Sequence, residues 1–83
     1  MMDDEEIIER LRSLRGKAAA VAIAAELADL RGVHSEGALV TYFKRAFPEI
    51  PLRVLRDAGG WNRLSGGGLS DRELEALLDP WLR

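Results

Sequence analysis

Glycines and prolines divide this 83-residue sequence into five short segments, and apolar residues recur within the segments at helical spacing. The alternation of apolar and polar residues that is typical of half-buried strands occurs in none of them. There is no internal repeat, and no linker separates two parts of the chain. We therefore expect a single all-α domain over residues 1–83, a compact bundle of five to six short helices.

Capping and helix-breaking residues predict where these helices begin and end. Asp3 or Asp4 is suited to cap the first helix, and Ser35 the third. Ser70 and Glu73 have the spacing of a capping box at the start of the fifth helix. The expected helices cover about residues 4–15, 17–30, 36 to 46 or 47, 51–58, and 71 onward.

Further boundaries come from glycine and proline. Gly16 and Gly32 are expected to end the first two helices. Pro51 suits the first position of the fourth helix, and Pro80 is expected either to end the fifth helix or to kink its last turn. Residues 61–64 have the length of one further helical turn.

The apolar positions predict which helix faces are buried. The second helix is apolar on nearly every side, which is typical of a helix at the centre of a bundle. In the fourth helix we expect Leu52 and Leu55 to point inward. Trp61 and Trp81 lie near apolar helix residues and are expected in the core, with an exposed position at an interface as the alternative. The expected inner face of the fifth helix consists of Leu74, Leu77, Leu78 and Trp81.

The composition excludes several kinds of site. The chain has no Cys and one His, so it holds neither a disulfide nor a Cys-based metal site, and a zinc site would lack ligands. The longest apolar run, residues 18–25, is far shorter than the roughly 20 residues that span a bilayer. The acidic N-terminus does not resemble a secretory signal. We expect a cytoplasmic protein with no membrane association, no metal and no cofactor.

Catalytic and phosphate-binding interpretations find little support. Ser35 follows His34, but adjacent residues at a helix start usually point apart, and Ser35 is better explained as a cap. Residues 66–68 are three glycines before a helix, as in some phosphate-binding loops. No strand precedes them, no Lys-Ser/Thr pair follows, and Asp71 and Glu73 would repel a phosphate. We expect a protein that is not an enzyme.

Residues 24–35 resemble the helix, glycine turn and capped start of a helix-turn-helix motif, whose recognition helix would be residues 37–46. Arg31 and Ala38 occupy positions where that motif usually has larger apolar residues. The start of the recognition helix offers Glu36 and Gly37 instead of basic or amide side chains. The net charge of −2 also argues against a general nucleic-acid binder. A DNA-binding regulator remains the alternative to a protein-binding module.

Charge is distributed unevenly along the chain. Residues 43–63 hold five basic and two acidic side chains, whereas residues 1–42 hold eight acidic and five basic ones, and residues 64–83 four acidic and two basic ones. This pattern is either ordinary mixed surface charge or a pair of complementary faces that dock one copy onto another or onto a related domain. The candidate basic face is Lys44, Arg45, Arg53, Arg56 and Arg63. Its acidic complement would come from Asp3, Asp4, Glu5, Glu6 and Glu9, or from Asp71, Glu73 and Glu75.

Residues 42–52 (YFKRAFPEIPL), Gly60-Trp61, the Gly-Leu-Ser-Asp of residues 68–71 and Pro80-Trp81 resemble effector-associated and Death-like domains of bacterial conflict systems. The resemblance covers about residues 39–82 and includes no catalytic motif. It implies a Death-fold type of bundle, in which six helices are typical. It also implies an adaptor that assembles, homotypically or heterotypically, with an effector in a bacterial defence or signalling system.

Overall fold

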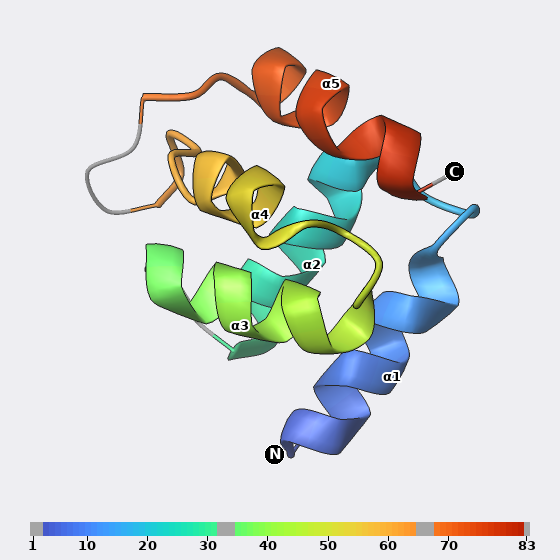
Figure 1. Ribbon diagram of the computed structural model, residues 1–83. Helices are drawn as coiled ribbons and strands as arrows, with labels where there is room; N and C mark the ends of the chain where they lie inside the picture. Colours follow the sequence, from blue (N-terminus) through green and yellow to red (C-terminus); the bar gives the residue numbers. More distant parts are fainter. Residues whose placement is uncertain (1–2, 32–34, 65–67, 83) are drawn as a thin grey trace.

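The computed structural model describes residues 3–31, 35–64 and 68–82, and these residues form five helices (Figure 1). The prediction of a small all-α bundle is confirmed, and within the described residues the only β-type pairing is an isolated bridge between Trp61 and Leu69. Gly32, the expected end of the second helix, lies outside the described residues. The helices are α1 (Asp4–Leu14), α2 (Ala20–Arg31), α3 (Glu36–Ala46), α4 (Leu52–Ala58) and α5 (Asp71–Leu82).

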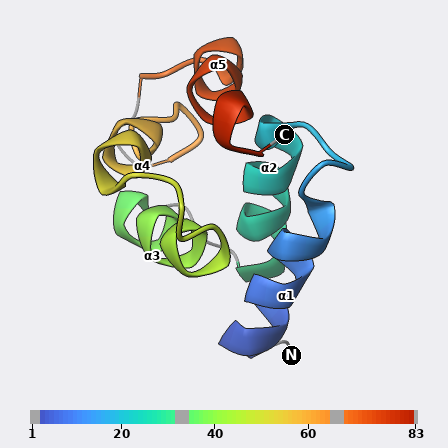
Figure 2. The ribbon, with the colours of Figure 1, turned by 45° about the vertical axis from the view of Figure 1, so that its right-hand side comes forward.

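The five helices form a closed ring around one core. α1 packs against α2 and α3, α3 against α4, α4 against α5, and α5 against α2. Figure 2 shows this order, with α5 at the top, α2 and α1 on one side, and α4 and α3 on the other. The prediction that α2 is central is wrong: it is one member of the ring, and its Ala22 and Asp29 are exposed.

Large side chains fill the centre of the ring. Phe43 of α3 and Phe47, the residue that follows the helix, meet edge to face, with ring centroids 5.5 Å apart, and Trp61 is fully buried. α2 contributes Ile23 and Leu27 to the same core. The expected burial of Trp61 is confirmed, whereas Trp81 is partly buried against the core.

The locally encoded helix starts are confirmed. The Asp3 carboxylate accepts from the Glu6 backbone N–H at 2.9 Å, and the Ser35 hydroxyl accepts from Ala38 N–H at 3.3 Å. Ser70 and Glu73 form the predicted capping box, each accepting from the other's backbone N–H at 3.1 Å. Each bond satisfies a donor that the first turn of a helix leaves free.

Other boundaries differ from the prediction. α2 begins at Ala20 instead of residue 17, and α4 begins at Leu52, with Pro51 as its N-cap. Pro80 does not end α5. It lies inside the helix, which continues through Leu82. Pro80 is exposed, and so is Ala76, the residue whose carbonyl loses its helical donor because of Pro80. Water can therefore solvate that carbonyl.

The predicted inward position of Leu52 is wrong. Val54, Leu55 and Ala58 form the buried side of α4, and this leaves Leu52 43% exposed. After α4, Leu64 N–H donates to Trp61 C=O at 2.9 Å, which closes a single turn. Within the described residues this turn does not extend into a sixth helix.

Candidate interaction surface

Three of the five predicted basic residues are engaged within the chain. Lys44 Nζ donates to the carbonyls of Pro48 (3.0 Å) and Ile50 (2.8 Å), and thereby holds the connection between α3 and α4. The other two form ion pairs: Arg45 with Glu5 at 3.7 Å, and Arg63 with Asp71 at 2.9 Å. Three members of the predicted basic face thus make contacts inside one molecule.

The acidic residues of the first helix also have local roles. Asp3 caps α1, and Asp4 Oδ1 accepts from the Tyr42 hydroxyl at 2.6 Å. Glu9 lies 3.7 Å from Arg12 in the same helix. Glu6 is exposed, and no hydrogen bond or ion pair joins its side chain to a described residue. The N-terminal acidic cluster therefore stabilises α1 and its contact with α3.

The acidic residues of α5 hold other elements in place. Asp71 accepts from Trp61 Nε1 at 2.7 Å as well as from Arg63. Glu73 belongs to the capping box, and Glu75 Oε2 accepts from the backbone N–H of Ala20, at the start of α2, at 2.7 Å. The sequence placed Arg63 on the basic face and Asp71 on the acidic face of a contact between two molecules. In the structure the two residues pair with each other within one chain.

Arg53 and Arg56 remain available on the outer side of α4. Both are exposed, and neither makes a hydrogen bond or ion pair with a described residue. Leu52 and Arg53 lie four and three residues before Arg56, so each neighbours Arg56 on the helix surface. Among the described residues, Leu52 is the one large hydrophobic residue that is exposed. We call Leu52, Arg53 and Arg56 the α4 patch.

Sequence reasoning identified both arginines of this patch but missed the leucine. The missed signal was the pair Val54 and Ala58, which are one turn apart and define the buried side together with Leu55. A helix of seven residues cannot bury Leu52 as well without turning Val54 outward.

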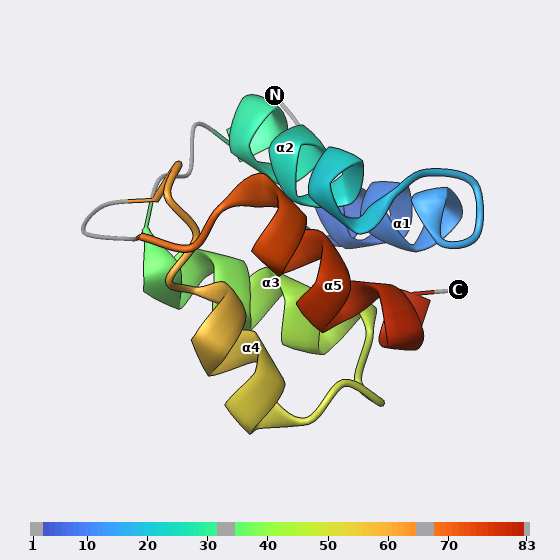
Figure 3. The same cartoon turned by 90° about the horizontal axis from the view of Figure 1, so that it is seen from above.

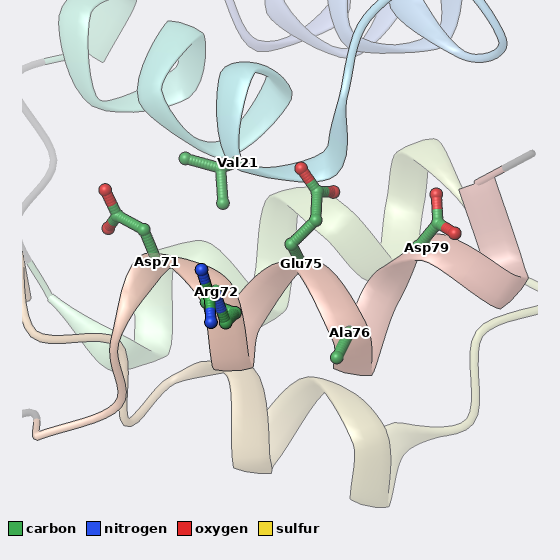
Figure 4. A pocket seen from close by; sticks show the side chains of 6 residues that line it. All are labelled: Val21, Asp71, Arg72, Glu75, Ala76 and Asp79. Atoms are coloured by element: carbon green, nitrogen blue, oxygen red, sulfur yellow. The ribbon is translucent and has the colours of Figure 1, made fainter.

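α5 lies between α2 and α4 (Figure 3). An open groove lies on each side of it. The α2–α5 groove has a volume of about 510 Å³, and Figure 4 shows Asp71, Glu75 and Asp79 in a row along α5 on the side of Val21. Arg72 and Ala76 complete its lining. The α4–α5 groove, of about 550 Å³, is lined by Asp57, Leu69, Glu73, Ala76 and Leu77.

The interpretations that involve His34, Gly66 and Gly67 concern positions outside the described residues. Within residues 3–31, 35–64 and 68–82, no group of three or more metal-ligating side chains is close enough to hold an ion. The same residues include no helix with the length and apolarity needed to cross a membrane.

The geometry of α3 bears on the helix-turn-helix alternative. α3 packs mainly against α1 and α4, whereas that motif requires its recognition helix to pack against the helix before it. Glu36 and Gly37 are exposed at the start of α3, and its basic residues Lys44 and Arg45 lie at the far end in contacts with the chain itself.

Comparisons with known proteins identify no relative of this chain. No protein-family model, no curated protein and no solved structure matches the chain. Its function is therefore inferred from its own surfaces, of which the α4 patch and the two grooves beside α5 are the most distinctive.

Proposed function

We propose that this chain is a non-enzymatic adaptor that binds other proteins through the α4 patch. The observation that carries the proposal is an exposed leucine beside two arginines that have no partner among the described residues. A single exposed leucine is common on protein surfaces. Arginine, however, is enriched in protein interfaces, and two arginines beside an apolar side chain provide both attraction and a contact from which water is excluded.

A rigid support for the patch favours this function. Leu55 and Ala58 are fully buried on the inner side of α4, and Lys44 holds the carbonyls that precede the helix. The backbone of α4 therefore needs no ordering when a partner binds, which reduces the entropic cost of association. Most other charged residues already make contacts within the chain, so the patch is the best candidate for a contact with another molecule.

The resemblance to effector-associated and Death-like domains suggests the kind of partner. Such a domain would join a fused or separate effector in a bacterial defence or signalling system, in the cytoplasm. The compact five-helix bundle is compatible with this role. The Death fold, the effector and the cytoplasmic location are all part of the proposal.

The test compares two double variants with equal net charge. In R53E/R56E the two arginines of the patch are reversed, and in K17E/R72E two exposed basic residues away from α4 are reversed. Each double reversal changes the formal net charge from −2 to −6. Because all four side chains are exposed, we expect stability to change by only about 0.5 kcal/mol in either variant, as thermal unfolding would show.

Immobilised wild-type chain and both variants are then exposed to the free, labelled chain and to proteins of the native host. We expect R53E/R56E to lose binding that the wild type and K17E/R72E retain, and we expect high salt to weaken this binding. Equal binding by all three would contradict the proposal. A shift of duplex DNA that weakens steeply with salt and is independent of the patch would favour the DNA-binding alternative.

A further inference from the structure

We infer that the α4 patch docks into the α4–α5 groove of a second copy of this chain. The inference rests on the proposed function of the patch and names its occupant. Each molecule carries both surfaces, one on the outer side of α4 and one between α4 and α5. A patch on one copy therefore always has a groove available on another.

The chemistry of the two surfaces is complementary. Three apolar residues, Leu69, Ala76 and Leu77, and two carboxylates, Asp57 and Glu73, line the groove. The patch offers one apolar side chain, Leu52, and two cationic ones. If the leucine packs against the apolar lining residues and the arginines pair with the carboxylates, apolar surface is buried and both charges are matched.

The two carboxylates are able to accept new hydrogen bonds. Asp57 is exposed, and its side chain makes no hydrogen bond or ion pair with a described residue. Glu73 uses Oε1 to accept from Ser70 N–H, which leaves Oε2 for an incoming guanidinium. A guanidinium presents several donors in one plane, and it can bind such oxygens without disrupting the capping box.

The α2–α5 groove is a poorer acceptor for the same patch. Its lining includes Arg72, which would repel incoming arginines. Two of its carboxylates already hold structural elements, since Asp71 binds Trp61 and Arg63, and Glu75 caps α2. A cation that competed for these carboxylates would weaken the fold that presents them.

The patch and the groove share no residue, and this predicts a specific pattern of complementation. A variant with a damaged patch keeps its groove, and a variant with a damaged groove keeps its patch. Neither should associate with itself, but a mixture of the two should associate. Mixing restores association when the contact joins two unlike surfaces, but it does not when the contact joins two identical patches.

The experiment measures molar mass by light scattering during size-exclusion chromatography, over a wide range of protein concentration. The patch variant is R53E/R56E and the groove variant is E73Q/A76R. Gln at position 73 preserves the capping box, and Ala76 is exposed on a helix, where Arg is well tolerated. The matched control is V21R, which places a cation in the α2–α5 groove instead.

We expect the wild type and V21R to exceed the monomer mass of 9.2 kDa as concentration rises. Each of the other two variants should remain monomeric, and their equimolar mixture should exceed the monomer mass but stop at a dimer, because each pair retains one intact patch and one intact groove. A monomeric mixture, loss of association in V21R, or a wild type that is monomeric at every concentration would overturn the inference.

The proposed function fails on different evidence. If the wild type is monomeric but captures another protein in a way that R53E/R56E abolishes, the second copy is excluded and the adaptor function stands. If R53E/R56E binds everything that the wild type binds, both proposals fail.

Discussion

Trp61 is fully buried, and its indole N–H donates to Asp71 Oδ1 at 2.7 Å. The other carboxylate oxygen of Asp71 accepts from Arg63, whose guanidinium lies 5.2 Å from the centre of the Trp61 ring. The backbone N–H groups of residues 68 and 69 both donate to the Gly60 carbonyl, which brings the chain just before α5 next to Trp61. At the scale of single residues, Asp71 thus joins the buried indole, an exposed cation and the start of α5.

Replacing Asp71 by Ala should lower the free energy of unfolding by about 1–3 kcal/mol, because the buried indole N–H loses its acceptor. Asp71→Asn should retain most of the stability, since an amide oxygen also accepts. Urea denaturation followed by circular dichroism measures both changes.

The control for this prediction is Arg63→Ala. The Arg63 side chain is 54% exposed, so its ion pair should contribute only about 0–1 kcal/mol. A loss in R63A as large as that in D71A would mean that the ion pair, and not the buried indole, accounts for the effect.

At the scale of elements, some helix ends are capped by residues close in the sequence, and others by residues far away in the sequence. The starts of α1, α3 and α5 have caps within four residues, and the sequence predicted all three. The start of α2 instead depends on Glu75, and the end of α3 depends on Arg12, which donates to the carbonyls of Arg45 (3.0 Å) and Ala46 (3.2 Å). Caps of this kind exist only after the chain has folded, so α2 was predicted to begin three residues early.

Removing the remote cap should therefore fray one specific turn. Glu75→Ala should cost about 0.5–2 kcal/mol, the usual range for a lost N-cap, and should speed hydrogen exchange of the amides at the start of α2. Arg72→Ala, a change at an exposed neighbour on α5 with no described partner, serves as the control. Equal exchange rates at Ala20 in both variants would show that Glu75 does not cap α2.

The candidate site could be predicted only in part for a related reason. Arg53 and Arg56 were recognisable as charges in a basic segment. Leu52 was misplaced because its three-residue spacing from Leu55 also fits one helix face, whereas Val54 and Ala58 set the buried side. The α4–α5 groove was not predictable, because Asp57 and Glu73 line the same groove only once α5 has packed against α4.

For the whole molecule, the ring arrangement means that each helix depends on its neighbours for stability. Each helix packs against two neighbours, and α5 closes the ring between α4 and α2. The end of α1 also reaches the end of α5, since Arg15 donates to the Trp81 carbonyl at 3.0 Å and pairs with Glu49. Removal of α5 would therefore open the ring on two sides, unlike in a repeat protein, where a terminal unit touches only one neighbour.

A chain that ends at residue 69 should consequently fail to fold, although it retains four of the five described helices. The truncation removes the buried residues Leu74, Leu78 and Leu82, each worth about 2–5 kcal/mol by comparison with truncation to Ala. A domain of this size has only about 4–12 kcal/mol of total stability. Circular dichroism should show no cooperative melting, and a peptide of residues 68–83 added in trans should restore it. Cooperative melting of the truncated chain alone would mean that the first four helices form a core without α5, and that the ring is not the unit of stability.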